Sequence, residues 1–380
     1  MIHALLGAST SKRWLTCTPS ARYEERFQET QSTYADEGSA AHALAEALLL
    51  DNQIKLQKAK KNEYYNQEMQ EAVEMYIDII KERYNEALSR SRDAKMFVEQ
   101  RLNFSEWVPE GFGTGDVIII ADGILEVIDL KYGQGVPVQA KDNPQLKLYA
   151  LGAIRAFDML YDVSVIRMTV IQPRLDNITT YETWTESLLN WAEDYVKPRA
   201  QLAWDGAGDY VSGEHCRFCR GKAVCRARAD HNLELAKYEF VQACALDTLD
   251  IAAILARMNQ LIDWVADVSE YALERAIQGT CFPGYKLVEG RSNRKYADQE
   301  KVAQKLTTEG YEETRIFKPR ELLGITEMEK LVGKKKFTVL LDALIIKPPG
   351  KPVLVPESDK RPEIQSLNTA NEDFKNESED

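Results

Sequence analysis

Residues 113–132 read GTGDVIIIADGILEVIDLKY, and this stretch decides the expected fold. Two runs rich in Ile, Val and Leu flank residues 122–123, an Asp-Gly pair that is a strong signal for a tight β-hairpin. With a two-residue turn, Asp116 falls directly opposite Asp129 across the hairpin. Lys131 follows two residues after Asp129 and therefore projects from the same face. The pattern predicts two carboxylates and one ammonium group at a single spot.

This combination of side chains suits the hydrolysis of phosphodiesters with a divalent metal. Carboxylates can hold Mg²⁺ or Mn²⁺ near a phosphate, and the metal lowers the pKa of a bound water. The lysine can orient that water or offset charge that develops on the phosphorus centre. The alternative is a surface hairpin that carries two chance acids and a salt-bridged lysine.

The sequence on either side of the hairpin predicts an α/β arrangement. Asn143 and Pro144 form a good helix start, with Asn as the N-cap and Pro at the first helical position. Apolar spacing predicts helices at 38–50, 63–91, 144–160, 186–203 and 248–278, and a further strand at 163–172.

Three cysteines follow these elements as C-x₂-C-x₅-C, at Cys216, Cys219 and Cys225. In a cytosolic protein such spacing indicates a metal or a cluster rather than a disulfide. Thiolates suit both zinc and iron–sulfur clusters, and either group needs a fourth ligand. The nearby candidates are His215, His231 and Cys244.

Composition and charge limit the class of protein. A length of 380 residues predicts two domains with a tail, and no apolar run reaches the ~18–20 residues of a membrane helix. The N-terminus lacks the basic start, apolar core and cleavage site of a secretory signal, so we expect a cytoplasmic protein. The net charge is −12, yet the stretch 214–230 has a net charge of +3. Because salt screens distant charges, an acidic chain can still bind nucleic acid through a local basic patch.

Several of these residues together resemble a known nuclease signature. Asp116 and the run Asp129-Leu130-Lys131 resemble the PD-(D/E)XK motif, with Asp in place of the commoner Glu before x-Lys. Further matches to the RecB-type branch are Gln145 and Tyr149 of its Q-x-x-x-Y motif, its upstream histidine at His42 and an accessory acid at Glu99. The resemblance covers about 10–230. The whole chain, including GKPVLVPESDKRP at 350–362, is similar to a phage- and prophage-encoded family of RecB-like nucleases.

The cysteines extend this resemblance to iron–sulfur members of the branch, such as the AddB-type and CRISPR-associated nucleases. Those proteins take one cysteine from before the nuclease core and three from after it. The resemblance therefore implies a 4Fe–4S cluster held by Cys17, Cys216, Cys219 and Cys225, with a zinc knuckle as the alternative. Cys244 and Cys281 are expected to be buried thiols.

For the fold, the resemblance implies a restriction-endonuclease-like core: a central mixed sheet flanked by helices, with the cysteine-ligated cluster. The expected domains are a nuclease domain at 1–235, a smaller α+β accessory domain at 245–350 and a disordered acidic tail at 357–380.

For function, the resemblance implies a DNA nuclease, an exonuclease that processes DNA ends in phage replication or recombination within the bacterial cytoplasm. The implied catalytic residues are Asp116, Asp129, Lys131, Gln145 and Tyr149, and the implied Mg²⁺ or Mn²⁺ ligands are His42, Asp116, Asp129 and the Leu130 carbonyl. DNA is the expected partner, with a single-strand-binding or annealing protein as a second. No phosphate-binding loop motif occurs, so no nucleotide cofactor is expected. The alternatives are a non-catalytic DNA-binding or scaffold protein with the same fold, and a structure-specific endonuclease.

Overall fold

The computed structural model describes residues 4–28, 33–234, 248–286, 307, 308 and 333. The chain divides into two units, Met1–Phe282 and Pro283–Asp380. The tail expected at 357–380 lies outside the described residues, as does most of the accessory domain expected at 245–350.

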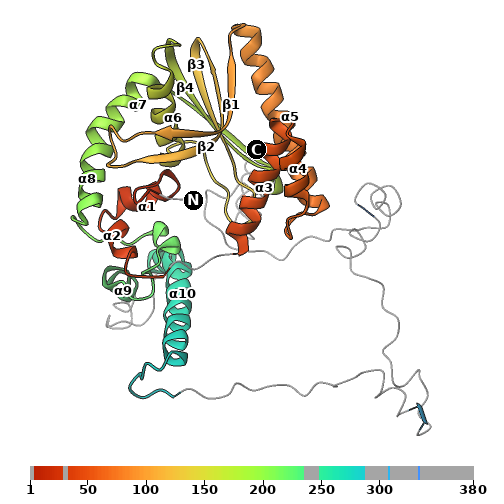
Figure 1. Ribbon diagram of the computed structural model, residues 1–380. Coiled ribbons are helices and arrows are strands. Elements are labelled where there is room, and N and C mark those ends of the chain that lie inside the picture. The colour runs from red at the N-terminus through yellow and green to blue at the C-terminus, as the bar shows by residue number, and fades with distance from the viewer. Residues whose placement is uncertain (1–3, 29–32, 235–247, 287–306, 309–332, 334–380) are drawn as a thin grey trace, which may run out of the picture. The chain divides into compact units, whose positions relative to one another are not determined.

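Five strands form a mixed sheet in the order β1-β2-β3-β4-β5 (Figure 1). The strands are β1 (Lys95–Asn103), β2 (Phe112–Ala121), β3 (Gly123–Leu130), β4 (Val163–Gln172) and β5 (Asn177–Trp184). The pair β3–β4 is parallel, and the other neighbouring pairs are antiparallel. The expected α/β class, with a mixed sheet flanked by helices, is confirmed.

The central hairpin has the predicted register. Ala121 pairs with Ile124, and the pairing continues to Val117 opposite Ile128. Gly123 has a φ of 84°, a conformation that glycine adopts without steric cost. Asp116 and Asp129 occupy the next position beyond the last pair, at the open end of the hairpin.

One face of the sheet is covered by α6 (Pro144–Phe157), which connects the parallel strands β3 and β4. The Asn143 side chain caps this helix by accepting from the backbone N–H groups of Gln145 and Leu146. Buried residues of α1 (Ser11–Thr16), α7 (Thr185–Trp191) and α8 (Lys197–Asp205) join the same core.

The opposite face is covered by α3 (Thr33–Leu49), α4 (Gln53–Lys60) and α5 (Gln67–Arg90). The expected apolar stripe of α5 is buried, because Val73, Tyr76, Ile77 and Ile80 recur at helical spacing and all point at the strands. A second hydrophobic core therefore lies on this side.

The remaining elements lie before and after the sheet. Helix α2 (Ser20–Glu24) precedes it, and α9 (Arg226–Leu233) and α10 (Thr248–Ile277) follow it. The helix expected at 186–203 is one continuous run in which a π-helical turn, Ala192–Val196, joins α7 to α8. None of the described helices is both long enough and apolar enough to cross a membrane.

Candidate active site

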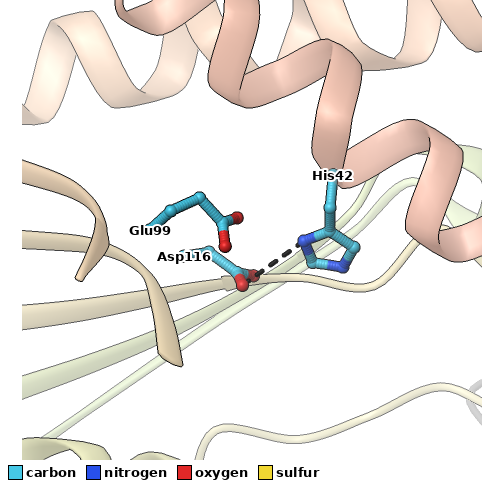
Figure 2. A group of neighbouring side chains, drawn as sticks. All are labelled: His42, Glu99 and Asp116. Carbon is cyan, nitrogen blue, oxygen red and sulfur yellow. Dashed lines mark ion pairs between the residues drawn. The ribbon is translucent and has the colours of Figure 1, made fainter. Parts of the chain in front are cut away.

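Three side chains from separate elements converge beside the sheet. Helix α3 carries His42, β1 carries Glu99 and β2 carries Asp116 (Figure 2). One ligand atom from each lies within 4.8 Å of the others, and no second group of this kind occurs in the described part of the chain. His42 Nδ1 lies 3.3 Å from Asp116 Oδ1. Two carboxylates and an imidazole at this spacing form a candidate metal site.

The backbone places Glu99 in this group through an unusual conformation. Residues on either side of it keep one register, with Val98 opposite Val117 and Gln100 opposite Gly115. Glu99 itself lies across from Asp116 without pairing and has a φ of 51°. Left-handed backbone at a residue with a long side chain is strained and tends to occur at functional sites. The sequence marked Glu99 as an accessory acid, but this geometry makes it a candidate ligand.

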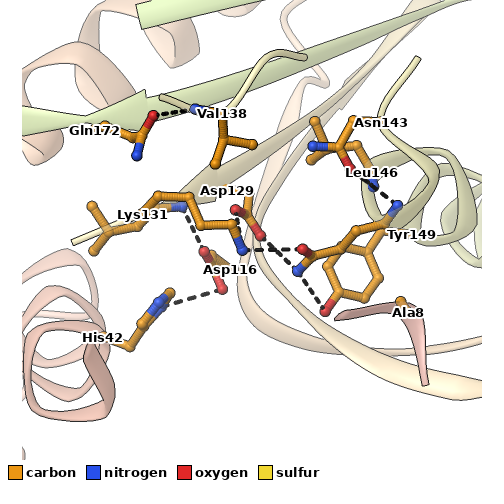
Figure 3. A network of polar contacts seen from close by, with 12 residues as sticks. Ala8, His42, Asp116, Asp129, Lys131, Val138, Asn143, Leu146, Tyr149 and Gln172 are labelled. Carbon is orange, nitrogen blue, oxygen red and sulfur yellow. Dashed lines mark hydrogen bonds and ion pairs between the residues drawn. The ribbon is translucent and has the colours of Figure 1, made fainter. Parts of the chain in front are cut away.

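A second group, beside the first, contains the other predicted catalytic residues (Figure 3). Lys131 Nζ forms an ion pair with Asp129 Oδ2 at 2.9 Å and donates to Gln145 Oε1 at 3.0 Å. Gln145 Nε2 donates to Asp129 Oδ1 at 3.1 Å and to Tyr149 Oη at 3.4 Å. Gln145 therefore contacts Asp129, Lys131 and Tyr149 at once.

Asp116 connects the two groups. The Leu130 N–H donates to Asp116 Oδ2 at 2.7 Å, while Asp116 Oδ1 faces His42. The structure thus brings all the predicted site residues of the hairpin, α3 and α6 to one place. Asp129 stands apart from the three-residue group, with each of its oxygens next to a side chain of the second group.

The electrostatics of the site follow from its crowded charges. Burial would lower the pKa of His42, but Asp116 prevails and raises it to about 9. Burial, together with Asp116, raises the pKa of Glu99 to about 7. Burial also opposes the charge on Lys131, yet Asp129 raises its pKa above the usual value, so the ammonium keeps its proton. A site with close carboxylates and a fixed ammonium favours a divalent cation and a phosphate.

A glycine makes room for Tyr149. A Cβ atom on Gly113 would lie 2.7 Å from Cε1 of the Tyr149 ring, closer than such atoms approach. Gly113 in the GTGD run therefore lets α6 seat its tyrosine against β2. The run lies within β2, and Gly113 serves packing there.

All four predicted cluster ligands line one cavity. Cys17, Cys216 and Cys219 are buried, Cys225 is half-buried, and all are free thiols. Burial raises the pKa of Cys219 to about 12, and Glu24 adds to this effect. Arg13 lines the same cavity and opposes this rise in the pKa of Cys219.

Polar contacts hold the N-terminal segment against the cysteine loop. Arg13 pairs with buried Glu24 at 2.7 Å and donates to the Phe218 carbonyl at 3.0 Å. Glu24 in turn accepts from the Arg220 N–H at 2.7 Å. These contacts bring Cys17 beside the three later cysteines.

The other candidate fourth ligands have different positions. His215 lines the cavity, but its Nε2 lies 2.9 Å from the Val211 carbonyl. His231 is on α9 and does not line the cavity. Cys244 lies outside the described residues. Cys281 is exposed, so the expectation that it is a buried thiol is wrong; it follows the end of α10, beyond the core.

The spacing of the sulfur atoms and the size of the cavity favour different groups as the one that the cysteines would hold. A single zinc ion with bonds of about 2.3 Å draws thiolates to about 3.8 Å from one another. No three of these cysteines meet within 4.8 Å in the described structure, so they are spread more widely. The cavity measures about 20 Å³, which is room for about one water. The donor set fits an iron–sulfur cluster, whereas the small volume fits a single ion.

The fold and the site together define an α/β protein with a mixed five-stranded sheet, flanking helices and a candidate acidic and histidine metal site. The chain belongs to the family described as "Protein of unknown function (DUF2800)", whose model matches residues 3–362.

Two solved structures are similar to parts of the chain. One is a crystal structure from Eubacterium rectale that is provisionally described as an exonuclease, with 13% identity and a TM-score of 0.35. The match covers 65% of this chain and 92% of that one. The other is SSO0001, with 15% identity, a TM-score of 0.23 and coverage of 55% and 94%. At these TM-scores neither likeness carries weight for fold or activity.

Proposed function

We propose that the protein is a metal-dependent DNA nuclease of the PD-(D/E)XK type, acting as an exonuclease on DNA ends in phage replication or recombination. The observation that carries the proposal is the meeting of His42, Glu99 and Asp116 beside the Asp129, Lys131 and Gln145 network. Such a site has metal ligands on one side and a fixed cation on the other.

The donor set fits Mg²⁺ or Mn²⁺, because carboxylate oxygens are the ligands that both ions prefer. The proposed ligands are His42, Asp116, Asp129 and the Leu130 carbonyl, and we add Glu99 because it lies close to His42 and Asp116. When bound, the metal would lower the pKa of a water and offset negative charge on the scissile phosphate.

The neighbouring side chains orient the reacting groups. Lys131 stays protonated beside Asp129, so it acts as a fixed positive charge that orients water and offsets phosphate charge rather than as a base. Gln145 holds the Lys131 ammonium through its amide oxygen, and its amide nitrogen reaches Tyr149. Tyr149 packs against Gly113 and keeps this amide in place.

The cysteine cavity has the proposed role of a clip. A 4Fe–4S cluster on Cys17, Cys216, Cys219 and Cys225 would join the two ends of the nuclease domain, and closing so long a loop stabilises the folded chain. The four thiols that line one cavity support the cluster. Zinc is the second candidate, favoured by the small cavity.

The outer surface of the cysteine loop supplies a proposed DNA contact. While the cysteines face inward, Arg217, Phe218 and Arg220 are exposed. Phe218 is 72% exposed, and the Arg217 guanidinium lies 5.9 Å from its ring centroid. Exposed cations bind phosphates, and an exposed ring can stack on a base.

Incubation of the purified protein with linear and covalently closed circular DNA tests the function. We expect Mn²⁺ to support degradation of linear DNA from its ends, and EDTA to abolish it. Nicking of the closed circle would favour the structure-specific endonuclease. Binding without cleavage in any divalent metal would favour the non-catalytic DNA-binding protein.

A further inference from the structure

Tyr76 lies on helix α5, in the core between this helix and the sheet. Its side chain is 1% exposed and belongs to the core that includes Val117, Ile128 and Leu130. These strand residues are the immediate neighbours of Asp116 and Asp129 along the chain. Tyr76 therefore belongs to the core beneath the strand ends that carry Asp116 and Asp129.

The hydroxyl group of Tyr76 has no hydrogen-bond partner in the described structure. Buried polar groups are nearly always paired, and an unpaired one has a free-energy cost. Packing alone would be met by phenylalanine, which fills almost the same volume without this cost. The Tyr76 hydroxyl is therefore free to donate to a group that binds at the site.

The carboxylates of the site affect the pKa of this hydroxyl. Burial raises the pKa of Tyr76 well above its usual value, and the carboxylates of Asp116, Asp129 and Glu99 raise it further. The phenol therefore keeps its proton and can donate it to a hydrogen bond. None of these carboxylates accepts a hydrogen bond from the Tyr76 hydroxyl in the described structure.

We propose that Tyr76 is a positioning residue of the metal site, whose hydroxyl donates a hydrogen bond to a water in the hydration shell of the divalent ion. Mg²⁺ and similar ions keep several waters when carboxylates bind them, and those waters need partners in the protein. The inference rests on the proposed function and adds a residue to it.

Tyr132 provides a matched control. Its hydroxyl is also buried and unpartnered, and burial raises its pKa to about 12. The acids that raise the pKa of Tyr132 further are Glu68 and Glu37, and neither belongs to the candidate metal site. Tyr132→Phe therefore deletes the same atom from a comparable environment that faces other charges.

The test is the affinity for Mn²⁺ without DNA, measured by titration calorimetry on the full-length wild type, Tyr76→Phe and Tyr132→Phe. We expect Tyr76→Phe to bind Mn²⁺ about 10-fold more weakly, as for other groups that orient metal ligands. Tyr132→Phe should bind like the wild type. The electron paramagnetic resonance spectrum of bound Mn²⁺ should change only in Tyr76→Phe.

Three results would overturn the inference. Equal Mn²⁺ affinity in the wild type and Tyr76→Phe would remove it while leaving the proposed function, provided that Asp116→Ala abolishes binding. Equal weakening in both tyrosine variants would show a general effect of hydroxyl loss. No Mn²⁺ binding by the wild type would end the proposed function and the inference together.

Discussion

At the scale of single residues, the site combines backbone strain with repulsion between carboxylates, and a metal would relieve the repulsion. Glu99 has a φ of 51°, and strain of this kind costs about 1–3 kcal/mol. Its carboxyl group also lies within reach of Asp116, and burial and this charge raise its pKa to about 7. A divalent cation between the two carboxylates would remove the repulsion. The strained backbone at Glu99 would then serve to place its carboxylate beside the cation.

The relative stability of the glycine and alanine variants should differ between residue 99 and an ordinary strand position. Because only glycine adopts a positive φ freely, we expect Glu99→Gly to be more stable than Glu99→Ala by about 1 kcal/mol. Gln100 is a strand residue with a regular partner, so Gln100→Ala should be more stable than Gln100→Gly. Urea unfolding of the metal-free proteins measures both differences, and the same order at the two positions would contradict the strain.

Substitutions in the metal site and in the lysine network should have different effects on Mn²⁺ binding and on cleavage. Asp116→Ala should abolish both Mn²⁺ binding and cleavage, whereas Lys131→Ala should bind Mn²⁺ but lose cleavage, because Asp116 is one of the proposed ligands and Lys131 is not. Asp122→Asn, in the hairpin turn, is the control that should keep both. Calorimetry and a cleavage assay report the two properties, and wild-type cleavage by Lys131→Ala would remove that residue from the mechanism.

At the scale of elements, local signals in the sequence were sufficient for the hairpin and for α6. The Asp-Gly turn sets the register of β2 and β3, and strand β4 has its predicted bounds of 163–172. Strand β5 was not predicted, although its Thr-rich sequence alternates between exposed and half-buried residues. An edge strand with few apolar residues lacks the hydrophobic pattern on which the prediction depends.

The sequence also predicted most residues of the candidate site. Motif spacing named His42, Asp116, Asp129, Lys131, Gln145 and Tyr149, and the structure brings them together. The position of Glu99 among the possible ligands depends on one backbone angle, and the role proposed for Tyr76 depends on helix packing. Neither property leaves a local pattern in the sequence.

The cysteine loop should bind iron only when Cys17 is present. We expect Cys17→Ser to lose iron as completely as Cys219→Ser, since both side chains line the same cavity. Cys281→Ser is the control, because Cys281 is exposed. Elemental analysis after anaerobic purification gives the iron and zinc content. Full iron in Cys17→Ser would place the fourth ligand elsewhere, and zinc without iron would favour the knuckle.

The outward-facing cations should set the affinity for DNA without sequence preference. Arg217→Ala and Arg220→Ala should each weaken binding and lower the slope of log affinity against log salt by about 1. Arg226→Ala is the control, because its guanidinium is paired with Asp230 at 2.9 Å. Fluorescence anisotropy with EDTA present measures binding alone. Unchanged slopes would move the DNA contact to another surface.

At the scale of the whole molecule, the first unit holds the two features on which the account rests. The sheet, α3 and α6 form the candidate metal site, while α1, α2 and the loop before α9 form the cysteine cavity. Ion pairs of Asp267 with Lys222 and Arg228 join α10 to the cysteine loop and α9 within this unit. This arrangement makes 1–282 the part whose chemistry the experiments address.

The release of nucleotides from linear duplex DNA tests the central claim most directly. Wild-type protein and Asp129→Asn are purified side by side without oxygen and assayed with Mn²⁺ and with EDTA. Asn keeps the size of the side chain and removes the charge that pairs with Lys131. The account predicts release only by the wild type with Mn²⁺. Equal release by Asp129→Asn, release in EDTA, or no release by the wild type in any divalent metal would contradict it.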